Sequence, residues 1–315
     1  MSPGVRERAQ FGAETDDDGR FVRQDSRFRD TVTADGGSGF RAEPGRYHLY
    51  VSLACPWAHR TVIVRRLKGL EDVISMSVVD PVRDERGWAF REGPGHGADP
   101  VNGFAYLAEA YTASDPGFSG RVTVPVLWDR ETGRIVNNES AEIIRILNTA
   151  FDEWGDASVD LYPAGLREEI DAVEDRVYHA VNNGVYKAGF ATTQAAYEEA
   201  FDALFAELDA LDRLLRGRRF LVGERRTEAD WRLFTTLIRF DAVYVGHFKC
   251  NLRRIVDYAA LWPYLRDLYQ TPGVAETVDF DHIKRHYYVT HDSINPTGIV
   301  PKGPELDLSL PHGRG

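Results

Sequence analysis

The run YHLYVSLACPWAHRTVIVRRLKGL, residues 47–70, decides the fold of the first half of the chain. It opens with a strongly β-prone stretch, and after Cys55 the apolar residues Val62, Ile63 and Leu67 recur at helical spacing. Gly69 then offers a stop for the helix. The sequence therefore predicts a strand that ends close to a cysteine and a helix that starts directly after it.

The segments that follow complete a small mixed domain. VISMSVV at 73–79 is the next strand candidate, and strand, helix and strand at this spacing form a βαβ unit with a parallel pair. After a Gly- and Pro-rich stretch at 81–120, which we interpret as a long loop or insertion, RVTVPVLWD and RIVNN predict two further strands and AEIIRILNTAF a helix. This order, β-α-β-insert-β-β-α, is that of a thioredoxin-like domain.

Strand patterns vanish beyond about residue 160, and helical periodicity takes over. In YEEAFDALFAELDALDRLL, at 197–215, apolar side chains fall three and four positions apart along one face. Thr227 and Asp230 in TEADWRLF resemble an N-terminal capping box, with Asp where Glu is commoner. The second half is therefore predicted to be all-α, and the tail, rich in Pro and Gly, to be loop.

These patterns predict an α/β domain followed by an all-α domain. The opening residues are polar and rich in Gly, Asp and Arg, so we expect an irregular extension with little core. The predicted parts are the N-terminal extension at 1–45, a thioredoxin-like domain at 46–155, an α-helical domain at 160–292 and a loop-like tail at 293–315.

The composition excludes several classes of protein. With 43% hydrophobic and 28% charged residues among 315, wholesale disorder and low-complexity repeats are ruled out. A formal charge of −11 disfavours nucleic acid and anionic lipid as partners. No apolar run reaches the roughly 18 residues of a membrane span, and the opening residues lack the apolar core of a signal peptide. Since two cysteines, Cys55 and Cys250, make no disulfide framework, we expect a cytoplasmic setting.

Cys55 is the candidate nucleophile. It stands between a strand and a helix, and Pro56 suits the first helical position. Free backbone N–H groups and the positive end of the helix dipole favour a thiolate there. Position 58 is Ala, so the local partner of a dithiol motif is missing, and an outside thiol must resolve any disulfide that Cys55 forms. The alternative is a buried cysteine acting as a small hydrophobe, which is how we interpret Cys250.

Two further features suit a thiol tripeptide. The Val124–Pro125 bond lies between two β runs. In thioredoxin-like folds a cis proline lies opposite the cysteine, and a cis turn here would leave the backbone of Val124 free to pair with an extended peptide. The alternative is an ordinary edge-strand proline. Glu139 and Ser140 precede the next helix, with Ser140 as the cap candidate. The helix start would hold a carboxylate and Glu139 an ammonium group, as in the γ-glutamyl end of glutathione, and Arg121 would add a positive charge for the other carboxylate. The alternatives are an ordinary helix cap at Ser140 and an exposed, solvated arginine at 121.

Together with the helical second half, these motifs resemble the glutathionyl-hydroquinone reductases, the Xi class of glutathione transferases. The resemblance covers about residues 40–305 and rests on the following runs: SLACPWAHRT, GRVTVPVLWD, NNGVYKAGFAT, EADWRLFTTLIRFDAVYVGHFKCN and HIKRHYY, with INPTGIVPKGP beyond it. It implies a glutathione transferase fold, a homodimer, and an enzyme without a metal that uses glutathione as co-substrate.

The chemistry that the resemblance implies is reduction of a glutathionyl-hydroquinone. The Cys55 thiolate attacks the glutathione sulfur, the hydroquinone leaves, and a second glutathione resolves the mixed disulfide. Because a bare aryl carbanion is too basic to leave, the ring carbon must first be protonated, which requires an acid near the ring and donors for the phenolic oxygens. A tyrosine phenol, neutral at pH 7, suits both tasks.

The resemblance assigns roles to individual residues. The acid falls on Tyr186, while Tyr244 and Tyr287 line the ring pocket and help to keep Cys55 ionised. The glutathione contacts are then Trp88, Arg121, Val122, Thr123, Val124, Glu139 and Ser140. Against this, most tyrosines of a helical domain are packing residues.

Other interpretations remain open at this stage. An omega-type thioltransferase or dehydroascorbate reductase is the nearest enzyme alternative, and a non-catalytic carrier of aromatic ligands is the alternative of another class. His282 and His286, four residues apart, have the spacing of metal ligands on a helix, but without a Cys cluster or an H-E-x-x-H motif a solvated or hydrogen-bonded role is favoured.

Overall fold

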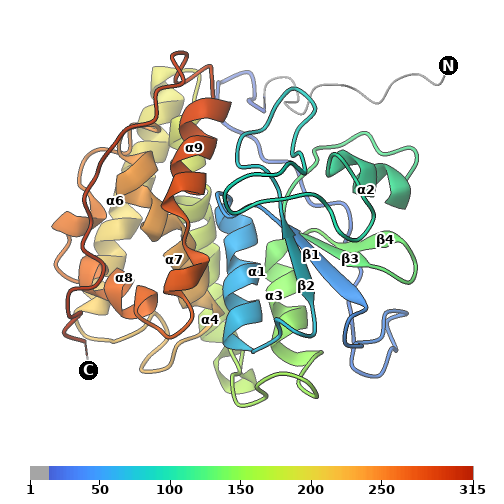
Figure 1. The fold of residues 1–315 in the computed structure, drawn as a ribbon. Coiled ribbons are helices and arrows are strands. Elements are labelled where there is room, and N and C mark those ends of the chain that lie inside the picture. The colour runs from blue at the N-terminus through green and yellow to red at the C-terminus, as the bar shows by residue number, and fades with distance from the viewer. Residues whose placement is uncertain (1–13, 315) are drawn as a thin grey trace. The chain divides into compact units, whose positions relative to one another are not determined.

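Four strands form a mixed sheet in the computed structural model, which describes residues 14–314 (Figure 1). They are β1 (Tyr47–Val51), β2 (Ser75–Val78), β3 (Val126–Asp129) and β4 (Arg134–Asn137). The sheet order is β2-β1-β3-β4, with β1 and β2 parallel and the other pairs antiparallel. This topology confirms the thioredoxin-like prediction and places the end of β1, just before Cys55, beside the segment that leads into β3.

Helices α1 (Pro56–Leu67) and α3 (Ser140–Thr149) run side by side along the sheet (Figure 1). The chain leaves α1 through Gly69, whose φ of +64° lies in the left-handed region, so the predicted helix stop is confirmed. The stretch interpreted as a loop contains α2 (Ala108–Ser114). This helix was missed because it is short and Gly- and Pro-rich segments flank it.

Parallel pairing of β1 with β2 places His48 between two hydroxyl groups. Its Nδ1 lies 2.6 Å from Ser75 Oγ and its Nε2 lies 2.9 Å from Ser77 Oγ, and the side chain is buried. Burial, helped by the positive charge of Arg130, lowers the pKa of His48 from 6.5 to about 4. The folded protein therefore keeps this imidazole neutral at pH values where the unfolded chain binds a proton.

We expect this histidine to make the fold sensitive to acid. Its contribution to stability is complete above about pH 6.5, shrinks as pH falls, and is lost near pH 4, because the unfolded state binds the extra proton first. This histidine contributes at most about 3 kcal/mol to the free energy of unfolding. Urea unfolding from pH 7 to 4.5 should show a smaller pH slope for His48→Gln than for the wild type, and equal slopes would contradict the assignment.

The second half is helical, as predicted. Its α-helices are α4 (Arg167–Val177), α5 (Gly184–Gly189), α6 (Gln194–Leu215), α7 (Glu228–Arg239) and α8 (Leu261–Tyr269). Wider, π-helical turns continue α4 at Tyr178–Asn182 and α7 at Phe240–Tyr244. Short 3₁₀ turns occupy Ala164–Leu166, Ile255–Asp257 and Ala275–Thr277.

The core of this half is α7, every residue of which is buried. The predicted capping box is present: the Thr227 N–H donates to Asp230 Oδ2 at 2.8 Å. Asp230 also accepts from the Leu221 N–H at 2.9 Å and the Tyr264 hydroxyl at 2.8 Å. Burial raises the pKa of this carboxyl, and the hydrogen bonds oppose that rise. The box thus joins α7 to the preceding loop and to α8.

By its internal contacts the described chain forms two units. The first holds residues 24–159 and 281–292; the second holds 14–23, 160–280 and 293–314. The sequence-based division gave 281–292 to the helical domain and treated 1–45 and 293–315 as parts of their own, whereas the contacts assign 14–23 and 293–314 to the helical unit. Helix α9 (Phe280–Thr290) belongs to the first unit from Asp281 onward, because its side chains bind the loop after β2, as described below. Within residues 14–314, no helix has both the length and the hydrophobicity to cross a bilayer.

Candidate active site

Cys55 lies where β1 gives way to α1. Its backbone is extended, with φ −79° and ψ 122°, and Pro56 follows as the first helical residue. The Cys55 carbonyl accepts the His59 N–H at 3.0 Å, so Cys55 is the N-cap of α1. The side chain is half-buried, and its thiol donates to the Val124 carbonyl at 3.7 Å. The predicted strand–cysteine–proline–helix arrangement is present, with the sulfur at the positive end of a helix.

The segment before β3 lies against this sulfur. The Val124–Pro125 peptide bond is cis. The preceding Thr123 is held at both backbone atoms by the Tyr111 hydroxyl, which accepts from its N–H at 3.1 Å and donates to its carbonyl at 2.8 Å. Among residues 14–314 the Val124 N–H has no hydrogen-bond partner. An extended peptide paired with Val124 would have its own side chain next to Cys55.

The start of α3 departs from the prediction in one detail. The N-cap is Glu139, not Ser140: Glu139 has extended backbone, and its carboxylate accepts the Ala141 N–H at 3.1 Å. The carboxylate can cap the helix itself because its other oxygen is held at 2.9 Å by the Ser26 hydroxyl. Ser140 is the first helical residue, is buried, and its hydroxyl accepts from Arg60 at 3.3 Å. Backbone N–H groups at such a helix start suit a carboxylate.

Trp88 packs against α9. Its ring stacks on His286 with centroids 5.0 Å apart and planes at 22°, and the Arg83 guanidinium lies 5.1 Å from the indole centroid. His286 Nδ1 lies 2.7 Å from the Pro81 carbonyl, and His282 Nε2 lies 2.7 Å from the Pro94 carbonyl. A ring nitrogen facing a carbonyl must donate, so these histidines fasten α9 to the loop that carries Trp88, and the hydrogen-bonded interpretation is confirmed.

The described residues contain no group of three or more His, Cys, Asp or Glu side chains placed to hold a metal ion.

Tyr287, on helix α9, is buried and packs against the rings of His286 and His291. It belongs to the same unit as Cys55. Arg121, Val122 and Thr123 are half-buried in the segment that leads to Val124.

Tyr186 and Tyr244 meet in the second unit, with ring centroids 6.2 Å apart. Both rings contact Phe248, Tyr244 in a nearly parallel stack at 5.4 Å and Tyr186 edge-on at 5.5 Å. Phe248 approaches so closely that a Cβ atom at Gly189 would lie 2.2 Å from its ring, so only glycine fits at the end of α5. Tyr244 is fully buried, whereas Tyr186 is half-buried and keeps access to solvent.

Sequence reasoning assigned no role to Phe21, a further member of this aromatic cluster. Its ring stacks on Tyr186 at 6.5 Å and lies 5.6 Å from Phe190. Phe21 comes from the segment interpreted as an irregular extension without a core, where no periodic pattern marks a buried residue. The available signal was a short apolar pair, Phe21 and Val22, between two arginines.

We expect the two thiols to differ sharply toward iodoacetamide at neutral pH. Cys250 is fully buried, and burial raises the pKa of its thiol to about 12, whereas Cys55 is half-buried at a helix start. Mass spectrometry of the native protein should find a single alkylated thiol, on Cys55. Labelling in a denaturant is the control that both thiols are free, and equal native labelling would contradict the prediction.

Comparison with known proteins identifies both halves. The model of the glutathione S-transferase N-terminal domain matches residues 54–150, and that of the C-terminal domain matches residues 194–267. The glutathionyl-hydroquinone reductase YqjG of Escherichia coli is 55% identical over 303 residues, 94% of this chain and 92% of YqjG. The glutathionyl-hydroquinone reductase PcpF of Sphingobium chlorophenolicum is 57% identical over 290 residues, 92% of this chain and 91% of PcpF.

Solved structures of similar proteins have the same fold as this chain. The glutathione-bound structure of YqjG superimposes with a TM-score of 0.90 at 55% identity, covering 91% of this chain and 96% of that one. A Xi class glutathione transferase from Natrialba magadii also has a TM-score of 0.90 and 55% identity, covering 91% of this chain and 88% of that one.

Proposed function

The chain belongs to the glutathionyl-hydroquinone reductases, the Xi class of glutathione S-transferases, and on that premise we propose that it reduces glutathionyl-hydroquinones with glutathione. The observation that carries the proposal is the position of Cys55: a half-buried thiol at a helix start, 3.7 Å from the carbonyl of Val124. A peptide thioether paired with Val124 would present its sulfur to this nucleophile.

The reaction has two thiol steps. In the first, the Cys55 thiolate forms a bond to the sulfur of the conjugate, and the bond from that sulfur to the protonated ring carbon breaks. The electron pair moves into the ring as an enolate, which takes a proton and leaves as the hydroquinone. In the second, a glutathione thiolate attacks the mixed disulfide, releasing glutathione disulfide and the Cys55 thiolate. The ring gains two electrons, which come from the two sulfurs joined in glutathione disulfide: the thioether sulfur of the conjugate and the thiol of the second glutathione.

Glutathione would lie along the first unit. The Val124 backbone pairs with its cysteine residue, while the N-terminus of α3 receives the γ-glutamyl carboxylate and Glu139 its ammonium group. Ser140 contributes its backbone N–H, because its buried hydroxyl already accepts from Arg60. Arg121, Val122, Thr123 and Trp88 complete the glutathione contacts.

The hydroquinone ring would be handled by three tyrosines. Tyr186 protonates the ring carbon, a role that fits its half-buried phenol and its place in an aromatic cluster with Tyr244. Tyr244 and Tyr287 donate to the phenolic oxygens and support the Cys55 thiolate. We further propose that the protein works in the cytoplasm, since glutathione and a reduced catalytic thiol both require a reducing compartment. From the family resemblance we also propose that it is a homodimer.

Turnover of two substrates tests the proposal. With glutathione in excess, the protein should release hydroquinone from a glutathionyl-benzohydroquinone and form one glutathione disulfide for each ring released. The comparison is a glutathionylated peptide, the substrate that an omega-type thioltransferase reduces. Reduction of the peptide alone would overturn the proposal in favour of a thioltransferase, and reduction of neither, with retained binding of aromatics, would favour a ligand carrier.

A further inference from the structure

Residues 14–22, here called the strap, form a small turn in the second unit. The Asp16 N–H donates to the Arg20 carbonyl at 2.9 Å, and the Gly19 N–H to the Asp16 carbonyl at 3.0 Å. The Val22 N–H closes the turn on the Glu14 carbonyl at 2.7 Å. The strap therefore has its own backbone structure, although its sequence carries no periodic pattern.

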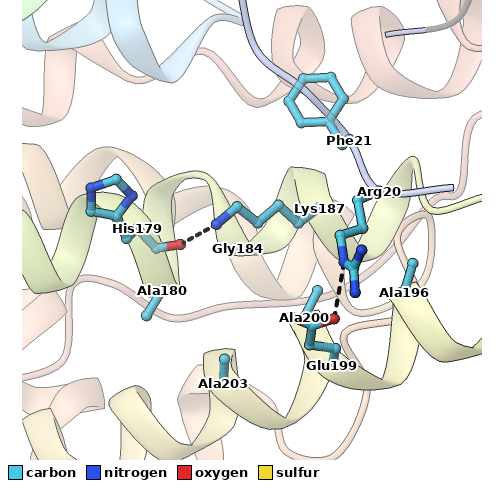
Figure 2. Close-up of a pocket in the computed structure, with 10 residues that line it drawn as sticks. All are labelled: Arg20, Phe21, His179, Ala180, Gly184, Lys187, Ala196, Glu199, Ala200 and Ala203. Atoms are coloured by element: carbon cyan, nitrogen blue, oxygen red, sulfur yellow. Dashed lines mark hydrogen bonds and ion pairs between the residues drawn. The ribbon is translucent and has the colours of Figure 1, made fainter. Parts of the chain in front are cut away.

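The strap is fastened to the start of α6 at three points. Arg20 Nε donates to Glu199 Oε2 at 3.1 Å, and Figure 2 marks this interaction with a dashed line. The Thr193 hydroxyl donates to the Asp18 carbonyl at 2.8 Å, and the Thr192 N–H donates to the Gly19 carbonyl at 3.1 Å. Gly19 has φ +81°, and a Cβ atom there would lie 2.7 Å from Thr192 Oγ1, so close docking requires glycine.

This fastening sets the position of Phe21, which is 8% exposed and stacks on Tyr186. Phe21 also lines a cavity of about 160 Å³ with Gly184, Lys187 and Ala200 among its other walls (Figure 2). Because this cavity adjoins Phe21, close packing does not surround the ring on every side. The hydrogen bonds of the strap, together with the contact with Phe190, hold the ring against Tyr186.

We propose that Phe21 is a positioning residue for Tyr186, holding its phenol where it can protonate the ring carbon of the hydroquinone; this rests on the function proposed above. Tyr186 is half-buried on the short helix α5 (Gly184–Gly189), so its ring needs lateral support to keep one orientation. A proton donor must lie within hydrogen-bond reach of its target, and a displacement of about 1 Å can cost about 10²-fold in rate. Phe21 supplies this support from a distant part of the chain.

Truncating the side chain tests the proposal. We expect Phe21→Ala to lower kcat for a glutathionyl-hydroquinone about tenfold while KM for glutathione stays within about twofold. Exchange of Cys55 with a small disulfide, which needs no acid at a ring carbon, should keep its rate. Phe21→Tyr retains the ring and should restore kcat. Phe220→Ala removes another buried phenylalanine, elsewhere in the same unit, and should leave kcat unchanged.

A measurement without turnover separates this proposal from the function on which it rests. 3-Fluorotyrosine at position 186 should give a ¹⁹F resonance that shifts in Phe21→Ala and not in Phe220→Ala. An unshifted resonance, or full kcat in both Phe21→Ala and the bulkier Phe21→Leu, overturns the positioning role. A shifted resonance in a protein that releases no hydroquinone supports the positioning of Tyr186 and overturns the proposed reaction instead.

Discussion

Replacing Cys55 by Ala should lower turnover of a glutathionyl-hydroquinone at least about 10³-fold, the largest effect expected of any single change in this chain. Without the Sγ atom nothing can accept the glutathionyl group, and the other thiol, that of Cys250, is fully buried with its pKa raised by burial. The measurement is kcat/KM from release of hydroquinone. Mass spectrometry of the wild type, given conjugate without free glutathione, should also show one glutathione bound per chain through Cys55.

Cys250→Ala is the matched control. It removes a thiol of the same size, so it should cost stability through the cavity that it leaves and keep kcat/KM within about twofold of the wild type. Equal losses from the two variants would contradict the role of Cys55 as nucleophile. Retained binding of aromatic compounds by Cys55→Ala, in a protein that never turns over, would point to a carrier.

Tyr186→Phe should lower kcat for the same substrate about 10²-fold, the scale of a lost general acid. The change removes the hydroxyl and keeps the ring, so the contacts with Phe21, Tyr244 and Phe248 persist. Exchange of Cys55 with a small disulfide should continue at the wild-type rate. The loss would then belong to proton transfer and not to the thiol.

Tyr197→Phe provides the comparison for Tyr186→Phe. Tyr197 is a tyrosine of the same unit whose hydroxyl donates to the Lys249 carbonyl at 2.8 Å, outside the aromatic cluster. Losing that hydroxyl should leave kcat unchanged. The two variants behaving alike would remove Tyr186 from the reaction and shift the search for the acid to Tyr244 and Tyr287.

Much of the fold could be predicted from short-range patterns. The spacing of Val62, Ile63 and Leu67 gave α1, and the Thr227–Asp230 box gave the start of α7, because capping and periodicity are local properties. Helix α2 escaped because seven residues are too few for a period to show. The unit to which α9 belongs also escaped, since the bonds from His282 and His286 to carbonyls far away in sequence leave no local trace.

The residues of the candidate site also fall into two groups, those that local sequence predicts and those that it does not. Cys55 and Val124 follow from residues next to them, Pro56 and Pro125, whose backbone constraints are visible in any sequence. Glu139 took the capping place expected of Ser140 because Ser26, distant in sequence, holds its carboxylate. The tyrosines came from family resemblance, since nothing local separates a proton donor from a packing residue. Phe21 could not be foreseen, because its burial depends on how the strap docks.

The order in which the chain visits its two units has a practical consequence for anyone who wishes to study them separately. The chain begins its described path in the helical unit, crosses to the sheet, returns to the helices, and sends α9 back before its last residues return to the helical unit. A single cut near residue 160 would leave each half missing a piece of itself. The sheet half would lose the helix on which Trp88 rests, and the helical half would lose the strap that backs Tyr186. To study the two units separately, α9 would have to be joined behind residue 159 of the sheet half through a linker. Residues 14–23 would have to be supplied in trans to the helical half.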